Sequence, residues 1–251
     1  MKNTLILFQR LMRHISRSPE TIASAVVQPT LIMLLFVFVF GGAIKASLPD
    51  GVNYVNFQLP GILVMAIAYN TSYTSLRIFS DKGKGIWARL DSMPINRSSP
   101  LWAHVLASIA SSLLSLAVVF SVALAIGFRT GAGFLAWLAV LGILAALSLA
   151  LTWVAVIPGL VSKSTDGASF LAFPLVFLPL FSSSFAPTET MPYFLRIFAE
   201  NQPVTPIVGT IRSLFGGEPV GGEIWVALAW CAGIMAVAWV AAMKIYKSRA
   251  R

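Results

Sequence analysis

The chain has 251 residues, of which 57% are apolar and only 11% are charged, and its formal net charge is +9. Soluble globular domains carry about a quarter charged residues, so this composition excludes that class and indicates an integral membrane protein. We expect one transmembrane domain over residues 1–251, because this length leaves no room for a nucleotide-binding domain as well. The single cysteine, Cys231, excludes an intrachain disulfide and a cysteine-based metal cluster.

The first expected element is an amphipathic helix over residues 1–20. Its apolar face consists of Leu5, Phe8, Met12 and Ile15. Its basic face consists of Arg10, Arg13, His14 and Arg17. This pattern is typical of a helix that lies in the membrane interface, although a simple positively charged anchor has the same composition. We expect Pro19 to end or kink this helix.

Six uncharged runs follow, and each is long enough for a helix of about 20 residues that crosses the bilayer. They extend over residues 21–44, 51–76, 98–128, 130–162, 167–188 and 224–243. The first run is too long for a typical signal peptide, so we expect it to be retained. The sequence therefore predicts an all-α, polytopic membrane protein with six transmembrane helices.

The distribution of basic residues predicts the orientation of these spans. With a cytoplasmic N terminus, fourteen lysines and arginines face the cytoplasm and four face outward. The outward four are Lys45, Arg129, Arg196 and Arg212. Because cytoplasmic loops are enriched in Lys and Arg, we expect both termini and the 77–99 loop in the cytoplasm, at the cell membrane, and the 182–223 region outside. The basic residues are thus topology signals, and we expect no nucleic acid as a partner.

Polar residues in the first two spans allow two interpretations. Asn70 and Thr74 lie four residues apart in "YNTSYTS", so they share a helical face, and Tyr73 lies close by. Gln28 stands beside Pro29 in the first span. These side chains either line a pathway between two subunits or form hydrogen bonds between the helices of one subunit. The sequence leaves both interpretations open.

The cytoplasmic loop over residues 81–99 is expected to contain a short helix. Gly83 and Gly85 break the preceding span, and Pro94 ends a short apolar stripe. The stripe consists of Trp87, Leu90 and Met93. Such a helix would present three polar residues to a soluble partner, namely Arg89, Asp91 and Asn96. A solvated hairpin loop is the alternative, since basic loops beside the membrane are common.

The region between the fifth and sixth predicted spans is interrupted by prolines and charges. Its uncharged pieces, 190–195 and 201–211, are far too short to cross a bilayer. We therefore expect a helix, a break and a second helix over residues 188–215, a re-entrant hairpin that enters the outer boundary of the membrane and leaves again. Backbone breaks at that depth need polar partners. The residues suited to that role are Ser182, Ser183, Ser184 and Asn201.

Motifs typical of enzymes and of ion-coupled transporters are absent from the sequence. It contains no G-x-x-x-x-G-K-[ST] phosphate loop, no G-x-S-x-G elbow and no H-E-x-x-H pair. His104 opens the third span near the cytoplasmic boundary, where an interfacial or capping role is expected. No carboxylate lies in the middle of a predicted span, as coupling to an ion gradient usually requires. We expect no catalytic residue, cofactor or metal on this chain, and any ATP would be hydrolysed by a partner.

Two stretches resemble ABC-2-type export permeases. "ARLDSMPINRSSPLWAHVLAS" is similar to the loop between the second and third spans of this family. "FPLVFLPLFSSSFAPTETMPYFLRIFAENQPVTPIVGTIRSLFGG" is similar to the fifth span, the Met-Pro start of a short outer helix and the break that follows. In layout the whole chain looks most like the daunorubicin-exporter type. The basic "DKGKGIW" and the "NQP" in place of Asn-Pro depart from the family pattern.

The resemblance implies roles for two groups of residues. The loop helix would couple the chain to an ATPase subunit through Arg89, Leu90, Asp91, Met93, Pro94 and Asn96. The outer hairpin would form a gate that includes Phe185, Pro187, Met191, Pro192, Asn201 and Pro203. The implied partners are a separate ABC ATPase that binds ATP and Mg, membrane lipid, and a second permease subunit. We expect this second subunit to be another copy of the chain, with a close relative as the alternative.

These observations predict the permease subunit of an ATP-driven exporter that moves an amphipathic drug, a lipid, a glycolipid or a polymer out of the cytoplasm. The alternative is a multi-pass membrane scaffold or assembly protein whose polar loops only dock partners. Stimulation of a co-purifying ATPase by this chain would separate the two. The sequence does not identify the substrate, because a large apolar pathway suits all of these solutes.

Overall fold

The structure, a computed structural model, describes residues 2–45, 53–87 and 98–249. Over these residues it consists of helices and connecting turns, without a strand. The elements up to residue 87 are α1 (Lys2–Ser16), α2 (Pro19–Leu35), the π-helix η1 (Phe36–Phe40), α3 (Gly41–Lys45) and α4 (Tyr54–Gly83). Those after residue 97 are α6 (Ser99–Ala125), α7 (Phe134–Val161), α8 (Thr165–Phe177), the 3-10 helices η2 (Leu178–Phe181) and η3 (Thr188–Thr190), α9 (Tyr193–Asn201), α10 (Val204–Gly216) and α11 (Glu223–Arg249).

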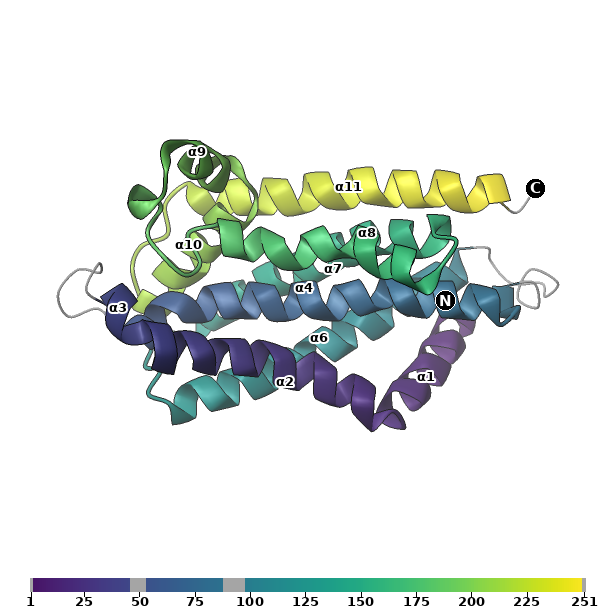
Figure 1. The fold of residues 1–251 in the computed structure, drawn as a ribbon, viewed down its shortest axis with the longest axis horizontal. Coiled ribbons are helices and arrows are strands. Elements are labelled where there is room, and N and C mark those ends of the chain that lie inside the picture. Colours follow the sequence, from purple (N-terminus) through teal and green to yellow (C-terminus); the bar gives the residue numbers. More distant parts are fainter. Residues whose placement is uncertain (1, 46–52, 88–97, 250–251) are drawn as a thin grey trace.

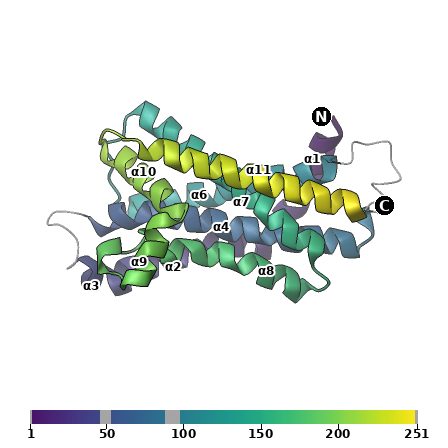
Figure 2. The ribbon, with the colours of Figure 1, turned by 90° about the horizontal axis from the view of Figure 1, so that it is seen from above.

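The long helices lie side by side, and successive ones alternate in direction (Figures 1 and 2). Helix α4 occupies the centre, in contact with α2, α6, α7, α8 and α10. Every side chain from Leu59 to Ala68 is buried. One apolar cluster surrounds the first half of α4, and a second cluster, which includes Ile78 and Trp153, surrounds its last turns. The polar residues of α4 are therefore held inside the bundle by apolar packing on both sides of them.

Two glycines allow neighbouring segments to approach α4 closely. A Cβ atom at Gly159 of α7 would lie 2.7 Å from the carbonyl oxygen of Ser75 and 2.8 Å from Cβ of Ile78. A Cβ atom at Gly61 of α4 would lie 2.4 Å from Cβ of Ser184. Close-packed interiors do not tolerate such contacts, so both positions require glycine. They set how near α7 and the turn after η2 lie to the central helix.

Four helical segments in the described part of the chain are long and apolar enough to cross a membrane. They are Ala25–Ile44, Ser99–Ala125, Phe134–Val161 and Glu223–Ser248. Helix α4 is longer, with 30 residues, but does not belong to this group, and its second half contains polar and charged residues. The chain is a multi-pass membrane protein, and the part of it that the structure describes is helical throughout apart from its turns. Crossing by α4 and α8 as well, which would give six spans, stays a prediction.

The fifth predicted span is shorter in the structure than the uncharged run in the sequence. That run reaches residue 188, whereas α8 ends at Phe177 and continues only as η2 to Phe181. Ser182 is extended, and its Oγ donates to the carbonyl oxygen of Pro179 at 2.6 Å, which ends the helix. With rises of 1.5–2.0 Å per residue, the segment covers roughly 27 Å, slightly less than the hydrocarbon core of about 30 Å.

Helix α1 lies oblique to the long helices and packs against α6 and α2 (Figure 1). It ends at Ser16, and Pro19 begins α2, so the break predicted at Pro19 is present. Ile15 is buried against the bundle, whereas Leu5 and Ile6 are more than half exposed. The last turn of α1 is therefore anchored while its first half presents apolar side chains outward, as an interfacial helix requires.

The two chain ends lie at the same end of the bundle, together with the C-terminal end of α4 (Figure 1). We call this the terminal end. Helices α3, α9 and α10 lie at the opposite end, which we call the hairpin end. The segments predicted to be cytoplasmic and those predicted to lie outside are thus found at opposite ends of the bundle. Which end faces the cytoplasm stays a prediction.

Candidate functional site

A carbonyl group in α2 joins three helices through polar side chains. Pro29 lies inside α2 and has no N–H, so the carbonyl oxygen of Ala25 lacks its usual helical donor. Asn70 of α4 donates to this oxygen at 3.3 Å, and also to that of Ala66 at 2.9 Å. Ser115 of α6 donates to the Ala25 oxygen at 2.8 Å. The proline therefore creates an acceptor in the bundle interior that Asn70 and Ser115 satisfy.

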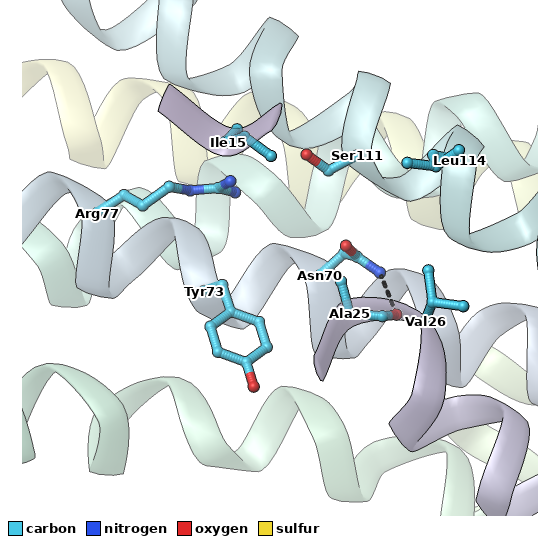
Figure 3. A pocket seen from close by; sticks show the side chains of 8 residues that line it. All are labelled: Ile15, Ala25, Val26, Asn70, Tyr73, Arg77, Ser111 and Leu114. Atoms are coloured by element: carbon cyan, nitrogen blue, oxygen red, sulfur yellow. Dashed lines mark hydrogen bonds between the residues drawn. The ribbon is translucent and has the colours of Figure 1, made fainter. Parts of the chain in front are cut away.

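A narrow crevice lies beside this junction, bounded by α1, α2, α4 and α6 (Figure 3). Its lining includes Ile15, Val26, Asn70, Tyr73, Arg77 and Leu114. Its volume is about 20 Å³, which is enough for roughly one water molecule. In this arrangement of the helices, the crevice does not hold a bulky solute.

The four residues predicted to line a pathway lie in different environments. Asn70 and Thr74 are buried inside the subunit, and Thr74 Oγ1 accepts a hydrogen bond from Arg77 at 3.0 Å. Tyr73 is half-buried at the crevice, and Gln28 is exposed on α2. The hydrogen bonds of Asn70 have the form expected for contacts between helices of one subunit. A pathway role for any of the four residues stays a prediction.

At the terminal end, an aspartate and a histidine connect α4 to α6. Asp81 Oδ2 lies 3.3 Å from Nε2 of His104, whose side chain is 4% exposed. Burial raises the pKa of Asp81, but the hydrogen bond with His104 and the charges of Arg10 and Lys84 outweigh it and hold the pKa below its usual value. The ring of Trp87 lies parallel to the His104 ring, with centroids 6.3 Å apart. Sequence reasoning did not pair Asp81 with His104, although both flank the same loop.

The residues predicted to couple this chain to an ATPase follow Trp87 directly. They are Arg89, Leu90, Asp91, Met93, Pro94 and Asn96, and they lie outside the described residues. Trp87 is the last residue that the structure describes before them. Its ring packs edge-on against that of Tyr246 of α11, with ring centroids 5.4 Å apart. The segment that leads into the coupling residues is therefore held by α6 and α11 together. The coupling role itself stays a prediction.

At the hairpin end, two short helices are separated by a break. Helices α9 and α10 flank Gln202, whose backbone is extended, and Pro203. Among the predicted gate residues, Phe185 is buried and stacks on Phe36 of η1, with ring centroids 4.4 Å apart. The half-buried gate residues are Pro187, Met191 and Pro203, and the exposed ones are Pro192 and Asn201. Phe185, just before the hairpin, is thus the one buried residue of this group, and it contacts the first predicted span.

A glutamine, and not the predicted asparagine, joins this break to the end of η2. Gln202 is buried, and its Nε2 donates to the carbonyl oxygen of Phe181 at the end of η2. Asn201 donates to the carbonyl oxygen of Ile197 within its own helix at 2.8 Å. Ser182 forms hydrogen bonds at the end of η2, as expected of the serines. The "NQP" that departs from the family pattern therefore supplies the side chain that joins the end of α9 to η2.

Arg212 of α10 is a further structural anchor that sequence reasoning placed outside without a role. Its guanidinium donates to the carbonyl oxygen of Phe57 from two nitrogens, at 3.0 and 3.2 Å, and to that of Ser183 at 3.0 Å. It also lies over the Phe57 ring, 3.8 Å from the centroid. Burial lowers the pKa of Arg212 to about 10. The Arg212 side chain thus joins α10 to α4 and to the turn that contains Ser183.

Basic side chains, and not metal ligands, gather in the cavities of the described residues. Among residues 2–45, 53–87 and 98–249, no three His, Cys, Asp or Glu side chains come together in a way that could hold a metal ion. A cavity of about 440 Å³ at the hairpin end includes Arg129, Arg212 and Glu218 in its lining. A second cavity, at the terminal end, is lined by three cationic side chains from α1 and α4. Both cavities therefore have more cationic than anionic side chains in their linings.

The sequence profile described as ABC-2 type transporter matches residues 2–215. The chain is 26% identical over 250 residues to the daunorubicin resistance ABC transporter permease protein of Streptomyces coeruleorubidus, an alignment that covers 98% of this chain and 86% of the relative. It is 25% identical over 237 residues to a protein of Mycobacterium tuberculosis described as a probable doxorubicin resistance ABC transporter permease, covering 93% and 84% of the two chains.

Proposed function

The chain belongs to the ABC-2 type transporter family, and on this basis we propose that it is the membrane-embedded permease subunit of an ATP-driven exporter in the cell membrane. The family resemblance predicted from the sequence is confirmed. The observation that carries the proposal is the similarity over 98% of the chain to a single permease of daunorubicin resistance. A multi-pass scaffold would not need to preserve this layout from end to end.

The proposed energy source is a separate ABC ATPase subunit that binds ATP and Mg. The sequence contains no G-x-x-x-x-G-K-[ST] loop that could cradle the phosphates of ATP. The terminal end carries the anchored Trp87, which leads into the residues proposed to contact the ATPase. We assign this end to the cytoplasm, in agreement with the basic residues of α1 and of the C-terminal segment.

The proposed substrate is an amphipathic drug, a lipid, a glycolipid or a polymer. The two relatives are named for daunorubicin and doxorubicin resistance, which favours a drug as the first solute to test. The crevice beside Asn70 is too small for any of these solutes. We therefore propose that the pathway opens between two copies of the chain, with the hairpin of α9 and α10 as the outer gate.

The experiment is reconstitution of the full chain with its ATPase in proteoliposomes, with daunorubicin and a fluorescent phospholipid as probes. We expect ATP-dependent movement of at least one probe. Leu90→Asp and Met93→Asp should abolish that movement while the subunits still co-purify. The matched control is Leu135→Asp, because Leu135 is 79% exposed and lies in the first turn of α7, where a negative charge is favourable.

Two outcomes would contradict this proposal. Co-purification of the ATPase without movement of any probe, together with full ATPase activity, would favour the scaffold alternative. Equal movement in Leu90→Asp, Met93→Asp and the wild type would remove the coupling role from the 81–99 loop. Pairing of two copies is tested separately, since a cysteine at the exposed Gln28 should form cross-links between subunits, whereas one at the buried Asn70 should not.

A further inference from the structure

A cavity of about 200 Å³ lies between α1 and α4 at the terminal end. Its polar lining consists of Arg10, His14, Arg77, Ser80, Asp81 and Lys84. Sequence reasoning assigned Arg10 to a membrane-facing helix and left Arg77 and Lys84 as topology signals in a loop. The fold brings these three cations to the walls of one cavity. This cavity plays no part in the transport mechanism proposed above.

The charges around the cavity favour an anion. Three cationic side chains face it, from Arg10, Arg77 and Lys84, against one carboxylate, that of Asp81. The Asp81 carboxylate, which also lies 3.3 Å from His104, offsets part of this charge, so the cavity keeps an excess of cationic side chains. Like charges at close distance repel one another, so three cations around one space need a counter-charge. An anion in the cavity would supply it.

Arg77 adds a specific unsatisfied donor. It is half-buried, and one terminal nitrogen donates to Thr74 at 3.0 Å. Its Nε has no hydrogen-bond partner among the residues that the structure describes. A buried N–H group without an acceptor costs free energy, which an incoming oxygen atom would relieve. Phosphate oxygens suit this role, because a guanidinium binds them through two parallel N–H groups.

The cavity adjoins the narrow crevice beside Asn70, which has a largely apolar lining. The crevice of Figure 3 shares Ile15 and Arg77 with the cavity, and its other walls include Val26 of α2 and Leu114 of α6. Leu114 is 50% exposed, so this side of the crevice reaches the surface of a helix that is apolar enough to cross the membrane. The cationic cavity and an exposed apolar surface of α6 are thus separated only by the crevice.

We propose that the cavity between α1 and α4 binds the phosphate of an anionic membrane phospholipid, whose chains lie outside the narrow crevice, against the exposed apolar surface of α6 near Leu114. A lipid fits better than a free phosphate ion, because the cationic cavity shares Ile15 and Arg77 with a crevice whose other wall, Leu114, belongs to the exposed apolar surface of α6. The bound lipid would hold α1 against α4. The proposed role of this lipid is structural and does not depend on which solute is exported. The proposal can therefore be tested by lipid binding and Tm, without a transport assay.

The test uses the purified full chain in a neutral detergent, titrated with dioleoylphosphatidylglycerol, and measures bound lipid by native mass spectrometry and the shift in Tm. Dioleoylphosphatidylcholine tests the need for net negative charge, and soluble glycerol phosphate tests for a free-anion site. The cavity variants are Arg10→Gln, Arg77→Gln and Lys84→Gln. The matched control is Arg13→Gln, which removes an equal charge from an exposed position of α1 outside the cavity lining.

We expect phosphatidylglycerol to bind and to raise Tm, with an affinity about fivefold lower for each cavity charge removed and nearly unchanged in Arg13→Gln. Equal binding of phosphatidylcholine would overturn the proposal, and so would an equal effect of Arg10→Gln and Arg13→Gln. Equal binding of glycerol phosphate would replace the lipid site by a free-anion site. If Arg77→Gln fails to fold, the exposed Arg10 and Lys84 still decide the outcome.

Discussion

Replacing Gly159 by alanine should destabilise the packing of α7 against α4. The new Cβ atom would lie 2.7 Å from the carbonyl oxygen of Ser75, where ordinary contacts begin near 3.4 Å, so the two helices would have to separate locally by about 0.7 Å. The other close atoms are Cβ and Cγ2 of Ile78, at 2.8 and 2.9 Å. Neither partner can rotate away, because one belongs to the backbone and the other is the branch point of a stiff side chain.

The expected loss is about 1–3 kcal/mol, the usual cost of overpacking in a close-packed interior. The better helix propensity of alanine offsets at most about 1 kcal/mol of it. Gly142 of the same helix provides the matched control, since no atom lies within 4 Å of a Cβ placed there. Gly142→Ala should therefore be neutral or slightly stabilising. Thermal unfolding of the purified full chain in mild detergent, followed by tryptophan fluorescence, measures the difference.

The same substitution should also affect transport. Ser75 and Ile78 belong to the turns of α4 that lead to Asp81, so a displacement there would alter the segment that leads into the proposed coupling residues. Gly159→Ala should lower the amount of probe moved per ATP hydrolysed, whereas Gly142→Ala should not. Equal Tm values for the two variants would refute the argument that the contact at Gly159 sets the distance between α4 and α7.

Three further changes have defined outcomes. Arg212→Met should lower the free energy of unfolding by about 1.5–3 kcal/mol, because it removes charged hydrogen bonds to two segments. Arg129→Met should lower it less in the same unfolding assay, because the Arg129 side chain donates only to the carbonyl oxygen of the adjacent Phe128. Because the pKa of Asp81 is lowered in the fold, its carboxylate stabilises the protein above the ordinary pKa of about 3.9. This contribution should be lost as the pH falls below that value. The Tm of Asp81→Asn should therefore decrease less than that of the wild type between pH 6 and pH 3. In a Cys231→Ala background and sealed cells, an impermeant thiol reagent should label Thr188→Cys and Glu218→Cys but not Ser248→Cys, and labelling of the last would overturn the assignment of the terminal end to the cytoplasm.

The parts of the fold that local chemistry determines were predictable from the sequence. Pro19 separates α1 from α2 because it cannot continue a helix, and the glycines at 83 and 85 end α4 as expected. The uncharged runs at 98–128 and 130–162 correspond to α6 and α7, since apolar length alone specifies a membrane helix. The break between α9 and α10 at Gln202 and Pro203 follows from the proline.

The contacts between distant segments were not predictable in this way. The pair of Asp81 and His104 and the reach of Gln202 to Phe181 depend on how helices pack, which hydropathy does not encode. The early end of α8 was missed because Ser182 bonds back to Pro179, whereas the uncharged run continues for several residues. The best sequence signal for the buried junction was Pro29, because a proline inside a span frees a carbonyl oxygen for a partner.

The common position of the two chain ends makes a single-chain dimer feasible. Because Lys2 begins α1 and Arg249 ends α11 at the same end of the bundle, a polar linker between two copies would not have to cross the membrane (Figure 1). A flexible Gly/Ser linker spans about 5–6 Å times the square root of its length, so some 40 residues reach roughly 35 Å. Such a tandem protein would allow Leu90→Asp or Gly159→Ala in one copy only, and would reveal whether both halves must move for one solute to be released.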